Sequence, residues 1–90
     1  MKVYVLLHEW SSEDTEGTEI LGVYAESRLD MARQDMAQSA ARIKEEMPDA
    51  KWEDDYTWSD EDSIHMGFST PGFLLDVVYS WDILEREVKS

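Results

Sequence analysis

A single apolar helical stripe, set between strand-like segments, most constrains the fold of this 90-residue chain. From about residue 28 to 46, hydrophobic residues recur at spacings of three and four, which is the period of one face of an α-helix. The stripe consists of Leu29, Ala32, Met36, Ala40, Ile43 and Met47. Pro48 should end the helix, because the residue before a proline is sterically pushed out of the helical region.

The start of this helix carries a capping signal. Ser27 is followed three residues later by Asp30, which resembles a capping box with a short acid in place of the usual Glu. We therefore expect Ser27 to cap the first turn.

Two strands are predicted before the helix. Residues 2–10 place Val3, Val5 and Leu7 on one face and four further residues on the other, namely Tyr4, Leu6, His8 and Trp10. With both faces largely apolar, this segment is typical of an inner strand covered on one side and partly on the other. The polar loop 11–17 leads to a second strand over 19–24, so the two should pair as a hairpin, and Gly22 marks a bulge or close packing beneath the helix.

Three strands are predicted after the helix. Residues 51–58 alternate, with Trp52, Tyr56 and Trp58 on one face, and residues 63–68 and about 73–84 alternate in the same way. The polar tail 85–90 is expected to fray. The order β-β-α-β-β-β predicts an α+β fold, a single mostly antiparallel sheet with one helix packed on one face, in a single domain spanning residues 1–90.

The first half of the chain resembles a class of small uncharacterised bacterial and phage α+β domains. The likeness is carried by the opening MKVYVLLH strand, the ILGVY strand and the helix that follows Ser27. It implies a hairpin-plus-helix core and no particular activity. By size and charge alone, the whole chain also resembles anti-CRISPR and anti-restriction acidic inhibitors.

Charge constrains the partners more than it constrains the fold. The formal net charge is −13, and acids concentrate in two blocks, residues 9–26 with six acids and no base, and residues 45–62 with nine acids and only Lys51. Such a field repels nucleic acid and anionic lipid and attracts basic protein surfaces. The segment 63–81 carries only Asp76, so the acids do not form an even coat.

Composition and segment lengths bear on the cellular setting. The absence of cysteine excludes disulfides, thiolate zinc sites and a cysteine nucleophile, and is compatible with the cytoplasm. The apolar run at residues 3–7 is too short for a signal peptide or a membrane span. We expect a cytoplasmic protein that does not bind membranes.

Motifs for catalysis and metal binding are missing. His8 and His65 could share a metal only if their strands were neighbours, and the H-E-x-x-H pattern fails at Ser12. The acids at 60–62 begin like a calcium loop, but Pro71 stands where that loop requires Glu. No G-x-S-x-G or phosphate-binding glycine loop occurs. We expect no metal and no cofactor.

Acid–base catalysis by carboxylates needs an acid whose pKa is raised by burial. Only Asp54, Asp76 and Asp82 lie within apolar alternation. The other acids fall on predicted loops and outer faces, so a non-enzymatic protein is expected.

The aromatic residues do not by themselves indicate nucleic-acid binding. A stacking platform for single strands needs a basic groove to hold the phosphates, and eight bases against 21 acids cannot supply one. Most of the aromatic side chains should therefore be core, and a minority should be anchors for a protein partner.

The sequence favours a protein-binding module, of phage or mobile-element type, that mimics nucleic acid and blocks a basic nucleic-acid-binding protein. The expected contact residues are nine acids and one aromatic anchor: Glu13, Asp14, Glu16, Glu53, Asp54, Asp55, Asp60, Glu61, Asp62 and Trp58. The alternative is a small cytoplasmic structural or regulatory domain that forms a homodimer through a sheet edge or Trp face, with acidity serving only solubility. Whether the two acidic blocks form one face is left open.

Overall fold

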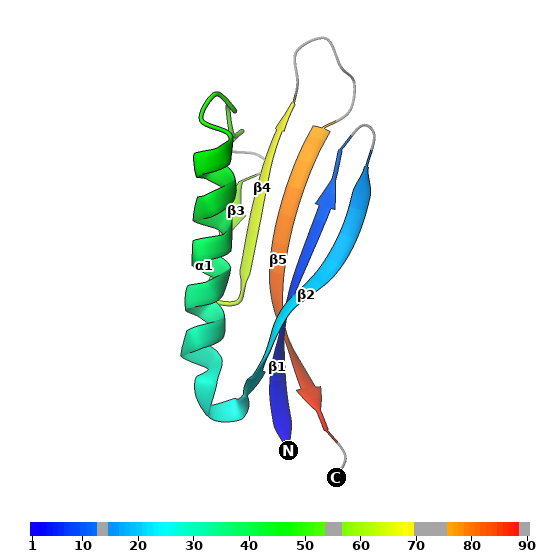
Figure 1. The fold of residues 1–90 in the computed structure, drawn as a ribbon, viewed down its shortest axis with the longest axis vertical. Coiled ribbons are helices and arrows are strands. Elements are labelled where there is room, and N and C mark those ends of the chain that lie inside the picture. Colours follow the sequence, from blue (N-terminus) through cyan, green and yellow to red (C-terminus); the bar gives the residue numbers. More distant parts are fainter. Residues whose placement is uncertain (13–14, 54–56, 70–75, 89–90) are drawn as a thin grey trace.

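The chain folds as a five-stranded antiparallel sheet with one helix against a single face, as the sequence predicted (Figure 1). The structure is a computed structural model that describes residues 1–12, 15–53, 57–69 and 76–88. Its elements are β1 (Lys2–Ser11), β2 (Glu16–Ala25), the 3₁₀ turn η1 (Glu26–Arg28), α1 (Leu29–Glu46), β3 (Trp58–Ser59), β4 (Ser63–Ser69) and β5 (Asp76–Glu87). The strand order is β2-β1-β5-β4-β3, so β5 lies between the two hairpins.

The β1–β2 hairpin contains the bulge that Gly22 predicted. Leu6 pairs with Gly22 but Leu7 pairs with Ile20, which leaves Leu21 as the extra residue. A Cβ built on Gly22 would lie 2.7 Å from the Tyr24 hydroxyl oxygen. Gly22 therefore makes room for the Tyr24 ring, which packs against the core.

The core lies between α1 and the sheet, and the predicted face alternation is confirmed for the described residues of β1, β4 and β5. The largest fully buried side chains are Leu6 of β1, Met66 of β4 and Trp81 of β5. From the helix, the buried residues are Ala32, Met36 and Ala40. Because two of these three are alanines, the helix can approach the sheet closely.

Trp81 joins the helix to the centre of the sheet. Its indole Nε1 donates a hydrogen bond of 2.9 Å to Ser39 Oγ on α1. Its ring stacks on that of His8, with centroids 4.4 Å apart. His8 is 7% exposed, and its Nδ1 lies 2.9 Å from the Ser80 carbonyl oxygen, which can only accept, so Nδ1 carries the proton.

The predicted strand over 51–58 is wrong in extent. Only Trp58 and Ser59 pair with β4, Lys51–Glu53 lie outside any strand, and residues 54–56 are outside the described part of the chain. Trp52 turns into the core instead, edge-on to Phe68 with ring centroids 5.1 Å apart. Trp52 therefore packs against the core, whereas Trp58, predicted to share its face, is 52% exposed.

The predicted cap of the helix is also wrong. The helix spans nearly the expected residues, but η1 precedes it, and neither Ala25 nor Arg28 at the two N-terminal caps makes a side-chain capping bond. Ser27 lies inside this 3₁₀ turn, so it cannot occupy the cap position. At the other end the Met47 backbone N–H bonds to the carbonyls of Ile43 and Lys44, just before Pro48.

The tail is ordered further than predicted. β5 continues to Glu87, which pairs with Lys2, and the Val88 backbone N–H donates to the Met1 carbonyl at 2.7 Å. The backbone ladder along β1 holds these polar residues in place, because main-chain pairing does not depend on side-chain polarity.

Substituting Ser39 tests the link between helix and sheet. Ser39→Ala leaves the Trp81 N–H without its acceptor, so the free energy of unfolding should fall by about 1–3 kcal/mol. Gln34→Ala at an exposed position of the same helix should change it by less than about 0.5 kcal/mol. Urea titration followed by circular dichroism gives both values, and equal values would show that the hydrogen bond does not matter.

Tyr24 provides a pH test. Burial and a hydrogen bond from its hydroxyl to Asp35 raise the pKa of Tyr24 from 10 to about 12. The unfolded chain therefore loses this proton first, and the free energy of unfolding should decrease between pH 10 and 12. Tyr24→Phe should remove that part of the decrease and the last tyrosine ionisation seen at 295 nm. An unchanged 295 nm titration would contradict the assignment.

Candidate functional site

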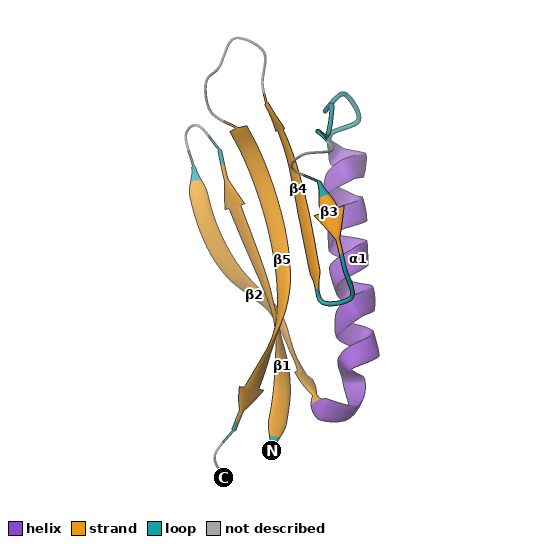
Figure 2. Cartoon of the chain, turned by 180° about the vertical axis from the view of Figure 1, so that it is seen from behind, coloured by secondary structure: helices purple, strands orange, loops and turns teal. Residues whose placement is uncertain are grey.

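The sheet face opposite α1, here called the outer face, is the candidate site. The helix packs against one side of the sheet, and no other described element covers the opposite side (Figure 2). Side chains on this face alternate with the core residues along β1, β5 and β4. The outer face has two parts with different chemistry.

The first part is aliphatic. Adjacent residues of β2, β1 and β5 form a row of Val23, Val5 and Leu84, and the rows on either side add further aliphatic side chains. We call this the aliphatic half, consisting of Val3, Val5, Leu7, Ile20, Val23 and Leu84. Ile20 and Val23 are 63% and 62% exposed. Exposed apolar clusters of this kind mark interaction surfaces more often than single exposed residues do.

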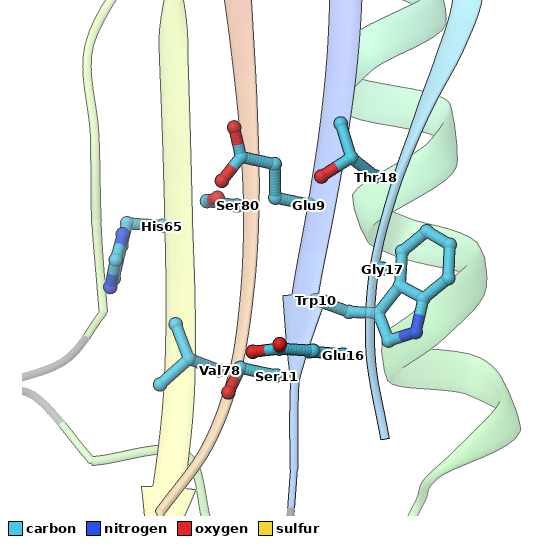
Figure 3. Close-up of a pocket in the computed structure, with 9 residues that line it drawn as sticks. All are labelled: Glu9, Trp10, Ser11, Glu16, Gly17, Thr18, His65, Val78 and Ser80. Carbon is cyan, nitrogen blue, oxygen red and sulfur yellow. The ribbon is translucent and has the colours of Figure 1, made fainter.

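The second part is acidic and rich in hydroxyl groups. Thr18, Glu9, Ser80 and His65 are consecutive neighbours across β2, β1, β5 and β4. We call this the polar half, consisting of Glu9, Ser11, Glu16, Thr18, His65 and Ser80. These residues line a shallow groove of about 530 Å³, shown in Figure 3. No Lys or Arg is among the described residues that line it, so the groove favours a cationic ligand group.

An aromatic pair extends this groove towards the β3 edge. Trp58 pairs with His65 in the ladder, and their rings stack with centroids 5.5 Å apart and planes 4° from parallel. Trp58 is 52% exposed. The residue predicted as an anchor is therefore held in a fixed orientation with half of its surface free.

The predicted acidic contact residues are only partly brought together. Glu16 lies in the polar half, and Glu53 is half-buried beside β4, where its backbone N–H bonds to the Gly67 carbonyl at 2.9 Å. Four of the predicted acids are outside the described residues: Glu13, Asp14, Asp54 and Asp55.

The three acids Asp60, Glu61 and Asp62 form the turn between β3 and β4. Arg33 of α1 lies 3.0 Å from Asp62 Oδ1 and 3.5 Å from Glu61 Oε2. Asp60 Oδ1 accepts the Asp62 backbone N–H at 2.9 Å, which stabilises the turn. A nearby guanidinium offsets part of this negative charge, so the turn is a weaker contact candidate than its sequence indicated.

The predicted contact acids that the structure describes on the sheet are divided between its two edges. Glu16 lies on β2 at one edge, and Asp60, Glu61 and Asp62 form the turn after β3 at the other, with β1, β5 and β4 between them. Sequence reasoning did not select Glu9 or His65 as contact residues, although both lie in the groove with Glu16. The two-residue spacing of Val5, Leu7 and Glu9, which puts all three on one face of a strand, is the signal that could have placed Glu9 there.

The two histidines cannot share a metal ion. His8 lies on the helix side of β1 and His65 on the outer face of β4, with β5 between the two strands. Among the described residues, no group of three or more His, Cys, Asp or Glu side chains could hold a metal. Asp82 accepts a hydrogen bond of 2.8 Å from Ser63 on the outer face, whereas Asp54 and the side chain of Asp76 are not described.

Comparison with protein family models, curated proteins and solved structures found no match for this chain. In the described ranges of the chain, no helix has the length and apolar character that a membrane span requires. The geometry of the outer face is therefore the basis for a functional proposal.

Two tryptophan substitutions should separate surface from core. Trp58→Ala removes a half-exposed ring and should lower the free energy of unfolding by about 1 kcal/mol, whereas Trp81→Ala should lower it by about 3–5 kcal/mol. Urea denaturation of both variants checks the contrast. Equal losses would mean that Trp58 is part of the core and unsuited to be an anchor.

Proposed function

We propose that this protein is a non-enzymatic, acidic protein-binding module that docks the polar half of its outer face on a basic surface of a partner. The observation that carries the proposal is that two exposed carboxylates, Glu9 and Glu16, share one sheet face with an exposed aromatic ring, Trp58, at the β3 edge. The carboxylates attract the basic surface of the partner during association. The aromatic ring then adds apolar contact area at the edge of the interface.

The chemistry of the groove favours a partner that normally binds nucleic acid. Glu9 lies opposite Thr18, two residues from Glu16 on the neighbouring strand, so the two carboxylates are diagonal neighbours, with Cα atoms about 7–8 Å apart. Negative groups at this spacing resemble successive phosphates of an extended strand. A basic channel that binds phosphates would therefore attract them, and the module would inhibit by occupying that channel.

Net charge contributes at longer range than the groove does. At −13, the whole molecule attracts a basic partner over roughly a Debye length, about 8 Å at physiological ionic strength. The turn acids Asp60 and Glu61 add to this steering, and the Arg33 pair limits the contribution of Asp62 to direct contact. We place this interaction in the cytoplasm, since the chain has no cysteine, and an inhibitor carried by a phage or mobile element is one such setting.

A charge-matched pair of variants tests the proposal. Wild-type protein, Glu9→Gln/Glu16→Gln and Glu45→Gln/Glu46→Gln are used for affinity capture at low salt from cells that contain defence nucleases. The second double variant removes the same charge from exposed positions at the end of α1. Basic nucleic-acid-binding proteins should be captured by the wild type and by the helix variant, and the groove variant should bind about tenfold or more weakly.

DNA competition and salt dependence are two further measurements on the captured complex. Added DNA should displace the captured protein, and binding should weaken steeply between 50 mM and 500 mM salt. If the two double variants lost binding equally, net charge rather than the groove would be responsible. If capture persisted at high salt and DNA did not compete, the proposed mimicry would be wrong.

A further inference from the structure

We propose that the aliphatic half of the outer face is the interface with a second copy of this chain. The two sheets would pack face to face with their strands antiparallel, around a two-fold axis that lies between the sheets and runs along the row of Val23, Val5 and Leu84. This inference is independent of the proposed function, because it uses the other half of the outer face. The alternative that the sequence leaves open is a homodimer through a sheet edge or a Trp face. The surface proposed here is a different one, the aliphatic half of the outer face.

The sequence of β1 supports a covered outer face. Val3 to Leu7 is an unbroken apolar run, a pattern typical of strands buried on both faces. Inside one molecule, only the Tyr4 and Leu6 side of this run meets the core. Val3, Val5 and Leu7 remain partly exposed. A second layer on the outer face would complete their burial.

The charged residues of β5 indicate that this second layer is another copy of the chain. Asp82, Leu84 and Arg86 alternate on the outer face at two-residue intervals, about 7 Å each. Asp82 accepts a hydrogen bond from Ser63, and Arg86 Nη1 donates to the Glu85 carbonyl at 2.9 Å. Within the described residues neither side chain forms an ion pair. Two unpaired opposite charges thus lie at equal distances on either side of Leu84.

A two-fold axis at Leu84 makes this pattern complementary to itself. Leu84 would lie over Leu84 of the second copy, and Asp82 would lie over Arg86 of the second copy, twice in each dimer. Self-complementarity of this kind is what a symmetric dimer interface requires. A parallel arrangement would instead place Asp82 over Asp82 and Arg86 over Arg86.

The same axis is consistent with side-chain size and with the net charge. It sets Ala25 of β2 against Ile20 of the second copy, so a small residue meets a large one. Along β1, the polar half begins at Glu9, beyond Leu7 as seen from the axis. The axis therefore places the two polar halves at opposite ends of the dimer. Repulsion between the carboxylates of Glu9 and Glu16 in the two copies is then small, and both grooves stay open for partners.

Sedimentation of the intact chain tests the dimer directly. We expect a monomer–dimer equilibrium between 10 and 200 µM that shifts towards dimer as salt rises from 50 to 500 mM, because screening reduces repulsion between two molecules of charge −13. Partner docking by the polar half has the opposite salt dependence, so the two proposals can fail separately. A monomer across this whole range would overturn the dimer and leave the proposed function intact.

Charge reversal tests the geometry. Arg86→Asp and Asp82→Arg alone should each weaken dimerisation tenfold or more, and a 1:1 mixture of the two variants should restore it as a heterodimer. Circular dichroism shows whether each variant folds. Should Asp82→Arg misfold through loss of the Ser63 contact, Val23→Glu at a 62% exposed edge position is the substitute, with the same expected loss. Dimerisation unaffected by all of these changes would overturn the proposed surface.

Cross-linking tests the register against the cysteine-free background of this chain. Leu84→Cys places two thiols across the axis and should give a disulfide-linked dimer on mild oxidation. Ser11→Cys, on the same face but beyond the overlap, should not. Equal cross-linking of the two variants, or none at Leu84→Cys, would contradict the antiparallel arrangement.

Discussion

The burial of Trp81 is the interaction on which the rest of this structure depends. It lies at the centre of β5, the strand that joins the β1–β2 hairpin to β4, and it is fully buried beneath α1. Its indole N–H must find an acceptor there, and Ser39 supplies one, which fixes the rotation of the helix over the sheet. His8 stacks on the same ring, so β1, β5 and α1 are brought together at one residue.

Because α1 packs against one face of the sheet, the outer face is left without a covering helix among the described elements. In the described part of the chain a single α-helix covers one face of the five-stranded sheet, so the strand residues of the other face point outwards. On β1 those residues are aliphatic up to Leu7 and then acidic at Glu9. The outer face is thus divided along β1 into the aliphatic half and the acidic polar half, which attracts cations. Self-association and partner binding can then use different ends of one surface.

Much of the fold could be predicted, because its elements rest on local periodicity. The helix and the alternation of β1, β4 and β5 follow from the spacing of apolar residues. The hairpin follows from the polar loop between its strands, and the bulge from a glycine within a strand. The candidate site was predicted less well. Glu16 and Trp58 were expected to make contacts and lie at the outer face, but the Arg33 pair with Asp62 joins residues 29 positions apart, and no local pattern encodes it. For the same reason, Glu9 and His65 could not be placed in one groove.

The sequence by itself determined the helix, the alternation of the long strands, the net charge and the presence of a strand with two apolar faces. These properties depend on residue type and on neighbours within a few positions. Only the tertiary structure decided the strand order, and with it which charges meet. By placing β2 and β3 at opposite edges, that order separates Glu16 from the acids of the turn after β3, and by placing β5 beside β1 it brings Glu9, Ser80 and His65 into one row. Strand order arises from long-range packing around Trp81, which no short segment of the sequence contains.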